Sequence, residues 1–392
     1  MRQAVIVSAT RTAVGTMAGT FASTTATELG AHAVREAIRR AGIEPGEVAE
    51  VILGNVLQAG LGLNPARIAA LAAGVPQSVG SYTINKACGS GLKAVALAAS
   101  SIMCGEADAI VAGGMENMSL APYFLRKARY GYRLGNDQLF DHMIADGLNC
   151  PITLVHMGVT AENIAAKYGI SRKEQDEFAA ESQARYFAAM RAGKFKAEIV
   201  PVEVQRGKET VQFQVDEHPR ETKADQIAGL KPAFKKDGSV TAANASGIND
   251  GASAVVVMAK EKAAVLGLKP MATIRSFASA GVDPAYMGLG PVPAVEKALK
   301  LAGIRREDIG LWELNEAFAA QSLGVLRELK LDRARVNVHG GAIALGHPVG
   351  ASGARILTTL LYAMADGGQS LGVATLCIGG GQGIAMVVER GA

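Results

Sequence analysis

Short apolar runs alternate with longer amphipathic segments along the first part of the chain. Residues 4–7 form an apolar run typical of a buried strand, and residues 28–41 place apolar side chains at helical spacing before a stop at Gly42. Residues 48–57 then predict a second strand that leads into a turn. The sequence therefore predicts the order strand, helix, strand near its start.

The same order returns after residue 270. Residues 272–278 predict a strand, residues 292–302 predict a helix that stops at Gly303, and residues 308–314 predict another strand. The two stretches match element by element, which indicates an internal duplication. A turn followed by a long helix also occurs twice, over 85–103 and over 337–364. Each is followed by a strand and paired glycines: the strand 107–112 precedes Gly113-Gly114, and the strand ending at Cys377 precedes Gly379-Gly380.

Alternating strands and helices in each half favour a layered α/β fold with helices on the faces of the sheet. A middle stretch breaks this pattern, because it is richer in charged residues and carries a strongly helical piece over 160–191. We expect three parts: an N-terminal core half over residues 1–120, completed by about residues 250–270; an inserted loop domain over 121–249 that covers the substrate; and a C-terminal core half over 271–392.

The composition indicates a globular protein that handles a small anionic molecule. Hydrophobic residues make up 49% of the chain and charged residues 19%, as in a globular protein. We expect no stretch of the roughly 18 apolar residues that a membrane span needs. The net charge of +4 includes no long Lys/Arg run, so we expect no nucleic-acid partner. Four cysteines in 392 residues do not make a disulfide framework. We therefore expect a cytoplasmic protein with reduced thiols and no membrane partner.

Two cysteines and one histidine stand beside glycines at the ends of predicted elements. Cys88 opens a Cys-Gly-Ser-Gly turn before a long helix, and Cys377 ends a strand that runs into a glycine-rich turn. His347 lies in the glycine-rich segment 340–348. Glycine allows the backbone to approach a ligand closely. Two thiols and an imidazole in such places suggest acyl transfer, in which one thiol is the nucleophile and the other moves a proton.

The other cysteines and histidines favour structural interpretations. Cys104 and Cys150 are expected to be inert core residues, and His32, His142 and His218 are expected on the surface. No His-Glu-x-x-His motif or clustered Cys/His spacing is present, so no metal site is predicted.

Four segments carry the most specific signal of the sequence: Asn85-Lys86-Ala87-Cys88-Gly89-Ser90-Gly91, Asn315-Glu316-Ala317-Phe318-Ala319-Ala320-Gln321, residues 340–353, and Cys377-Ile378-Gly379-Gly380-Gly381-Gln382-Gly383. In this order they resemble the four signature blocks of the thiolase family. The resemblance covers essentially the whole chain and is strongest with the biosynthetic, short-chain branch. It implies the duplicated, layered αβαβα fold of the family, with an inserted loop domain over a coenzyme A site.

The resemblance also implies a role for each central residue. Cys88 would be the nucleophile that carries an acetyl group as a thioester, and the dipole of the helix after it would favour the thiolate. His347 would activate Cys88 and, with a water held by Asn315, would form one oxyanion hole. Cys377 would remove the methyl proton of the second substrate. Backbone N–H groups of Cys88 and Gly379 would form a second oxyanion hole.

The implied reaction is a reversible ping-pong Claisen condensation of two acetyl-CoA molecules to acetoacetyl-CoA and CoA. Coenzyme A thioesters would be substrates, no cofactor would be needed, and the family suggests a homotetramer. Four residues would lie along the pantetheine and nucleotide of coenzyme A and three would shape the acyl end: Leu148, His156, Arg220 and Ser246, then Met157, Met287 and Phe318.

Two departures from the short-chain pattern leave the acyl preference open. Residues 153–155 lack the aromatic residue that short-chain members commonly carry before the pair His156-Met157. His339 resembles the His-Gly-Gly sequence of ketoadipyl-type thiolases. A degradative thiolase for longer 3-ketoacyl-CoA or 3-oxoadipyl-CoA is therefore one alternative. A non-catalytic acyl-CoA carrier would be expected to lose one thiol, and a ketoacyl synthase would need a second active-site histidine in place of Asn315 or Cys377. The sequence shows neither change.

Overall fold

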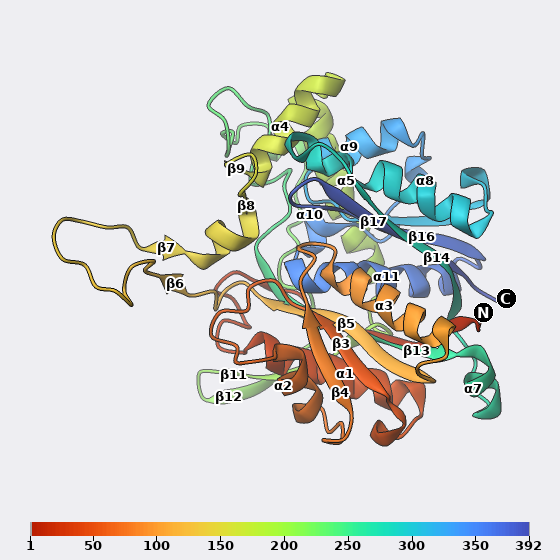
Figure 1. Ribbon diagram of the computed structural model, residues 1–392. Helices are drawn as coiled ribbons and strands as arrows, with labels where there is room; N and C mark the ends of the chain where they lie inside the picture. The colour runs from red at the N-terminus through yellow and green to blue at the C-terminus, as the bar shows by residue number, and fades with distance from the viewer. Residues whose placement is uncertain (1, 392) are drawn as a thin grey trace.

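The computed structural model describes residues 2–391 (Figure 1). Its N-terminal part contains β1 (Ala4–Thr12), β2 (Gly15–Thr16), α1 (Ala26–Ala41), β3 (Glu50–Gly54), α2 (Pro65–Ala72), β4 (Gly80–Ile84), α3 (Ser90–Cys104) and β5 (Ala109–Asn117). Its middle part contains β6 (Tyr123–Phe124), β7 (Phe140–Asp141), η2 (Met143–Leu148), β8 (Asn149–Cys150), β9 (Val155–His156), α4 (Met157–Tyr168), α5 (Arg172–Arg191), β10 (Ile199–Val200), β11 (Val202–Arg206), β12 (Glu209–Phe213) and α6 (Ala224–Ile227). Its C-terminal part contains β13 (Asn249–Ala259), α7 (Lys260–Val265), β14 (Ala272–Gly281), η3 (Pro284–Leu289), α8 (Pro291–Ala302), β15 (Leu311–Leu314), α9 (Ala319–Glu328), α10 (Ala342–Leu345), α11 (Val349–Asp366), β16 (Leu371–Ile378) and β17 (Gln382–Glu389).

The strand order repeats, as the sequence predicted. The sheet runs β15-β16-β17-β14-β1-β13-β5-β3-β4, so β14-β17-β16-β15 repeats the order β1-β13-β5-β3. In each half the first two strand pairs are antiparallel and the third is parallel. The parallel β3–β4 pair of the N-terminal half corresponds to a single parallel bridge from Trp312 to Val336 in the C-terminal half. The halves meet where Val5 pairs with Thr273. The predicted duplicated α/β fold is therefore confirmed.

Five layers follow from this duplication (Figure 1). Helices α3 and α11 pack against each other between the strands of the two halves, and α1 and α8 cover the outer faces. The segment 87–104, which contains α3, is long and apolar enough to cross a membrane by length and composition alone. The sequence expectation that no such stretch exists was wrong. In the structure its apolar side chains, such as Leu92 and Ile102, are buried in the core between the sheets.

Local signals place the helix ends where the sequence predicted them. Thr25 and Glu28 form a capping box at the start of α1, which supplies partners to backbone N–H groups that the helix leaves free. Gly42 ends α1 with φ 67°, and Gly303 ends α8 with φ 66°. Only glycine adopts this left-handed conformation without steric cost, so both stops are confirmed.

Strand β5 is longer than predicted, because Gly113 and Gly114 lie inside it. A Cβ atom at Gly113 would overlap the carbonyl oxygen of Ser253 in β13, and one at Gly114 would overlap the carbonyl oxygen of Gly350 in α11. These glycines therefore permit close packing between elements instead of ending the strand. They bring the first turn of α11 directly against the sheet.

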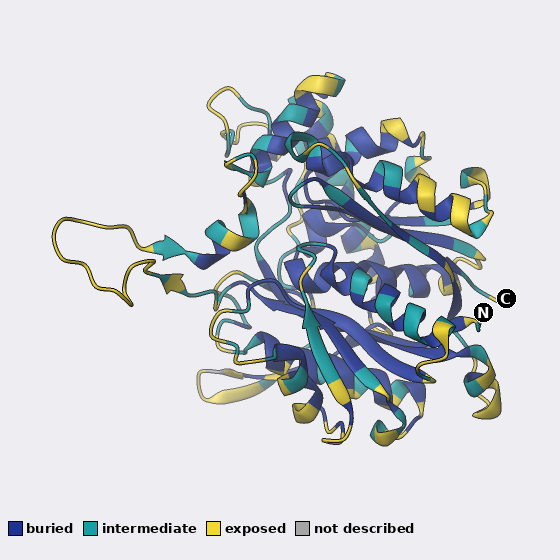
Figure 2. Ribbon diagram, viewed as in Figure 1, coloured by how far each residue is buried: buried dark blue, intermediate teal, exposed yellow. Residues whose placement is uncertain are grey.

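The middle stretch crosses the open end of the two halves. Its predicted helical piece is two helices, α4 and α5, because Gly169 ends α4 in the left-handed conformation with φ 59°. Residues 208–236, which follow these helices, contain β12 and α6. Between β6 and β7 the chain extends as a long arm, residues 125–139, that projects from the molecule and is largely exposed (Figures 1 and 2).

Candidate active site

A cavity of about 830 Å³ lies where the middle stretch meets the ends of the core elements. Its volume is near the upper end of the roughly 300–1,000 Å³ typical of ligand pockets. The carboxyl ends of strands meet at this edge, as is usual for ligand sites in α/β folds. Four of the five residues predicted at the reaction centre line the cavity, and the fifth contacts one of them: Cys88, His347, Cys377 and Gly379, with Asn315 beside His347.

Cys88 lies in a tight turn that leads into α3. Ala87 has φ 44°, an uncommon left-handed conformation for a residue with a side chain. The hydroxyl of Ser90 holds this turn, because it donates to the Ala87 carbonyl at 2.7 Å and accepts from the Lys86 N–H at 2.8 Å. The turn directs the Cys88 side chain into the cavity.

Burial raises the pKa of the Cys88 thiol, and nearby backbone N–H groups of Gly379 and Cys88 itself only partly oppose this effect. The carboxyl of Glu116 raises the pKa further. The helix dipole was expected to favour the thiolate, but the loss of solvation acts in the opposite direction and raises the pKa of the thiol. A thiol in this state needs a base to become a nucleophile.

His347 is placed to be that base. Its Nε2 atom lies 3.5 Å from the Asn315 amide nitrogen, and its Nδ1 atom lies 2.6 Å from Ser352 Oγ. The His347 backbone N–H donates to Asn249 Oδ1 at 3.0 Å. Burial, with a contribution from the charge of Arg355, lowers the pKa of His347 to about 4. The imidazole is therefore neutral at physiological pH and can accept a proton.

Cys377 lies near the end of β16, where it pairs with Gly383 of β17. The thiol is buried among apolar groups that include Met157, Met287 and Phe318. Burial raises its pKa, and the neighbouring Cys88 raises it further. Once deprotonated, the Cys377 thiolate would thus be a strong base, which removal of a proton from a carbon atom requires.

An aromatic stack lines part of the cavity. His156 lies nearly parallel to Phe234 with ring centroids 4.6 Å apart, and Phe234 meets Phe318 edge-on at 6.0 Å. Sequence reasoning missed Phe234, because it lies in an irregular stretch with no periodic signal. All seven predicted contacts line the cavity: Leu148, His156, Met157, Arg220, Ser246, Met287 and Phe318.

Two histidines expected on the surface are not exposed: His142 is buried and His218 is half-buried. His218 lines the cavity beside Gly247, and burial together with the charge of Arg220 lowers its pKa to about 4. His142 is 9% exposed, and its Nδ1 lies 2.7 Å from Asp146 Oδ2. Both expectations were wrong because the middle stretch folds over the cavity. Among residues 2–391, no group of three or more His, Cys, Asp or Glu side chains is placed to hold a metal ion.

Two buried carboxyl groups support the site without lining the cavity. Glu116, at the end of β5, accepts hydrogen bonds from the backbone of Val56, Leu57 and Gly350 at 2.9–3.1 Å. It therefore joins the end of β3 to the first turn of α11, close to His347. Burial raises the pKa of Glu116 to about 7.

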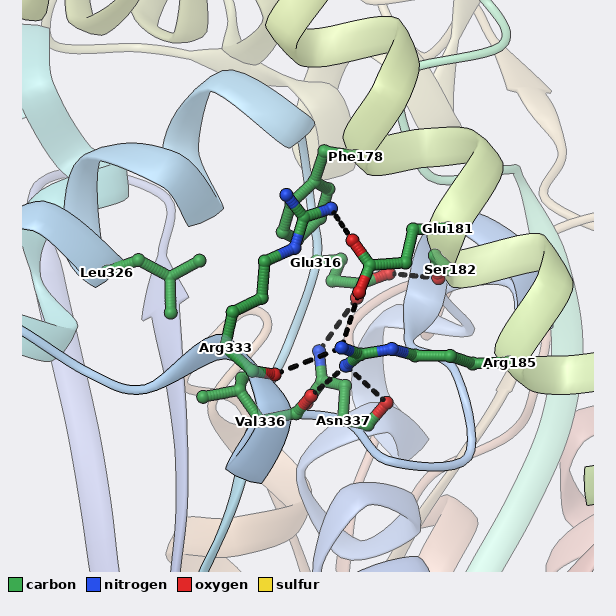
Figure 3. A pocket seen from close by; sticks show the side chains of 9 residues that line it. All are labelled: Phe178, Glu181, Ser182, Arg185, Glu316, Leu326, Arg333, Val336 and Asn337. Atoms are coloured by element: carbon green, nitrogen blue, oxygen red, sulfur yellow. Dashed lines mark hydrogen bonds and ion pairs between the residues drawn. The ribbon is translucent and has the colours of Figure 1, made fainter. Parts of the chain in front are cut away.

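Glu316 lies beside Ser182 and Asn337 in a second polar cluster (Figure 3). Its carboxylate accepts hydrogen bonds from Ser182 at 2.7 Å, from Asn337 at 2.8 Å and from the Ile343 N–H at 3.2 Å. These bonds join the segment after β15 to α5 and to α10, the short helix that precedes His347. The adjoining space, about 10 Å³, is too small for a substrate. Sequence reasoning singled out neither Glu116 nor Glu316, since each acts through partners distant in the chain.

Comparisons with known proteins agree with this geometry. The thiolase N-terminal domain family matches residues 4–261, and the thiolase C-terminal domain family matches residues 268–390. The chain belongs to the thiolase family. An acetyl-CoA acetyltransferase of Escherichia coli (strain K12) is 59% identical over 392 residues, which is 100% of both chains.

Two solved structures are also similar. The acetyl-CoA acetyltransferase of Bacillus anthracis is 46% identical with a TM-score of 0.98 and covers 100% of this chain and 99% of its own. The acetyl-CoA acetyltransferase of Syntrophomonas wolfei is 45% identical with a TM-score of 0.97 and covers 100% of both chains. All three of these similar proteins are named acetyl-CoA acetyltransferases.

Proposed function

We propose that this thiolase is an acetyl-CoA acetyltransferase, which converts two acetyl-CoA molecules to acetoacetyl-CoA and CoA in a reversible reaction. One observation carries the proposal: two thiols, Cys88 and Cys377, face one cavity together with the neutral imidazole of His347. Two thiols with different tasks suit a condensation that needs both an acyl acceptor and a base. The shared name of the similar full-length relatives supports the choice of acetyl-CoA.

In the first half-reaction, His347 Nε2 takes the proton of Cys88, and the thiolate attacks the acetyl carbonyl. The developing oxyanion is stabilised by fixed N–H donors, of which Gly379 and Cys88 already face the sulfur. The bond from carbonyl carbon to the coenzyme A sulfur then breaks. The leaving thiolate takes a proton back from the imidazolium, so free CoA departs and acetyl-Cys88 remains.

In the second half-reaction, Cys377 passes its proton to His347 Nε2, and the resulting Cys377 thiolate removes a methyl proton from a second acetyl-CoA. The resulting enolate oxygen lies toward Asn315 and the His347 imidazolium. The Nε2–H of the imidazolium donates to this oxygen, Asn315 acts through a water, and both stabilise its charge. The carbon then attacks acetyl-Cys88. A carbon–carbon bond forms and the Cys88 thioester breaks. The Cys88 thiolate takes the proton of the His347 imidazolium, and acetoacetyl-CoA leaves.

We propose a preference for short acyl chains. Met157, Met287 and Phe318 pack around Cys377, so the reaction centre has bulky apolar walls. One extra methylene in such a pocket changes discrimination by about 1–3 kcal/mol. Met287→Ala should therefore raise the relative rate with six-carbon 3-ketoacyl-CoA. Met190→Ala, at an exposed position in α5, is the matched control and should leave the chain-length profile unchanged.

Steady-state thiolysis with free CoA tests the proposal against its alternatives. Acetoacetyl-CoA should be cleaved faster than six-carbon or longer substrates, with the parallel double-reciprocal lines of a ping-pong mechanism. Faster cleavage of longer 3-ketoacyl-CoA or of 3-oxoadipyl-CoA would indicate a degradative thiolase instead. Binding of these thioesters without turnover would instead indicate an acyl-CoA carrier.

We further propose that four copies assemble. The arm over residues 125–139 carries large apolar side chains in solvent, including Leu134 at 100% and Tyr130 at 87% exposure (Figure 2). Such side chains on a projecting arm suit contact with another copy. Light scattering should give four times the 40.5 kDa chain mass, and L134E with Y130E should lower it. A monomer in the unchanged protein would overturn this assembly.

The expectations for location and cofactors stay proposals. We infer a cytoplasmic enzyme that needs no cofactor, since coenzyme A thioesters are its substrates, and that binds neither membranes nor nucleic acid. The modest net charge of +4 supports the last point. Full activity of protein dialysed against a chelator, with substrates as the only additions, is the expected result.

A further inference from the structure

His347 has a second polar neighbour that the reaction scheme does not use. Ser352 lies in the first turns of α11, is fully buried, and places its Oγ 2.6 Å from His347 Nδ1. The same Oγ lies 2.8 Å from the carbonyl oxygen of Pro348. Ser352 thus contacts both the imidazole and the backbone one residue after it.

The proton inventory of these three groups allows one arrangement. A carbonyl oxygen only accepts hydrogen bonds, and a serine hydroxyl has a single hydrogen to donate. That hydrogen goes to Pro348, because otherwise two oxygen atoms would face each other at 2.8 Å with no proton between them. The hydroxyl oxygen must then accept, so His347 Nδ1 must carry a hydrogen.

We propose that Ser352 is a positioning residue that holds His347 in the Nδ1-protonated tautomer and leaves Nε2 free to take the proton of Cys88. The proposal rests on the role of His347 in the proposed function. In this tautomer the Nε2 lone pair points to the Asn315 side of the imidazole, where the amide nitrogen lies 3.5 Å away.

The same contact serves both charge states of the imidazole. When His347 accepts a proton at Nε2, Nδ1 still donates to Ser352, so neither side chain has to move. A hydroxyl also differs from a carboxylate in this position, because it adds no negative charge that would hold the proton on the imidazole. His347 can therefore return the proton to the leaving thiolate.

The surroundings make Ser352 a rigid support. Its backbone N–H also bonds to the Pro348 carbonyl at 2.9 Å, and Gly350 in the same turn donates to Glu116 at 2.9 Å. A Cβ at Gly353 would overlap the backbone of Leu92 in α3. The first turn of α11 is thereby held against both α3 and the sheet.

The test combines S352A with two further variants. S352T keeps the hydroxyl. S8A is the matched control, since Ser8 is also buried and donates its hydroxyl to a helix carbonyl, that of Ala37, at 2.6 Å. Nitrogen-15 NMR of histidine-labelled protein reports which His347 nitrogen carries the proton. The rate of Cys88 acetylation and the KM for acetyl-CoA are measured on the same samples.

We expect the proton on Nδ1 in the unchanged protein, in S352T and in S8A, and a mixture or the other tautomer in S352A. Acetylation by S352A should slow by about 10- to 100-fold with KM within about twofold, less than the ~10⁴-fold loss when the wrong tautomer is enforced in a serine protease. S352T should recover most of the rate.

A proton on Nε2 in the unchanged protein, or an unaltered tautomer in S352A, would overturn the proposal. If S352A does not fold, the spectrum of the unchanged protein still decides. Absence of thiolase turnover with the proton on Nδ1 would contradict the proposed function and leave the tautomer assignment standing.

Discussion

The side-chain amide of Asn315 lies 3.5 Å from Nε2 of His347, and both residues are buried. Asn315 follows β15 and His347 precedes α11, so the contact joins the ends of two core elements. A fixed amide donor beside an imidazole nitrogen is an arrangement that stabilises negative charge on a substrate oxygen. We therefore expect this pair to stabilise the negative charge that develops on the substrate oxygen during the reaction.

Asn315→Ala should lower turnover much more than binding. Loss of one oxyanion donor typically costs about 10²–10³ in kcat, and a water between Asn315 and the oxygen softens the effect toward the lower value. The KM for acetoacetyl-CoA should change little. Steady-state kinetics decides, because an unchanged kcat with a raised KM would place Asn315 in binding.

Cys377→Ser should separate the two half-reactions. A serine hydroxyl is a far weaker acid than a thiol, so the variant loses the base that removes the methyl proton, while His347 still activates Cys88. Acetyl-enzyme should form at a nearly normal rate while condensation is strongly slowed. Cys104→Ser is the control and should behave like the unchanged protein, since Cys104 is exposed and not in the core as the sequence predicted. Full condensation by Cys377→Ser would refute the two-thiol mechanism.

Gly114→Ala should destabilise the fold and reduce activity together. Its methyl group would overlap the Gly350 carbonyl in the first turn of α11, and overpacking of a core typically costs about 1–3 kcal/mol. Gly229→Ala is the control, because nothing lies within 4 Å of a Cβ at that exposed position. Thermal unfolding of both variants is the measurement. Equal midpoints would mean that the glycine is not needed for this packing.

His218→Gln should weaken the pH dependence of stability. The pKa of His218 is lowered to about 4, whereas an unfolded histidine titrates near 6.5. The unfolded chain therefore binds one more proton than the folded chain between these values, and stability falls as the pH drops through this window. The loss in Tm from pH 7 to pH 5 should be smaller in the variant. An identical loss would show that His218 is not held neutral.

Local signals were sufficient to predict much of the fold. The helix stops at Gly42 and Gly303 follow from glycine alone, and the duplicated order of elements follows from apolar periodicity. The glycine turns after Cys88 and Cys377 also indicated where reactive side chains lie. In each case the physical cause is present within a short stretch of the sequence.

Non-local contacts explain what the sequence did not reveal. Gly113 and Gly114 were expected to end a strand, but their partners are Ser253 and Gly350, far along the chain. The raised pKa of Cys88 likewise depends on burial by distant segments, which a helix-end argument does not include. Phe234 and His218 line the cavity because the middle stretch folds over it, and this contact depends on segments distant in the chain.

The central claim is that Cys88 carries the acetyl group between the two half-reactions. Incubation with acetyl-CoA alone, followed by mass spectrometry of proteolytic peptides, tests this claim most directly. The account predicts one acetyl group on the peptide that contains Cys88, and its loss when free CoA is added. An acetyl group on Cys104 or Cys150 in place of Cys88, or no covalent product in an enzyme that turns over, would contradict it.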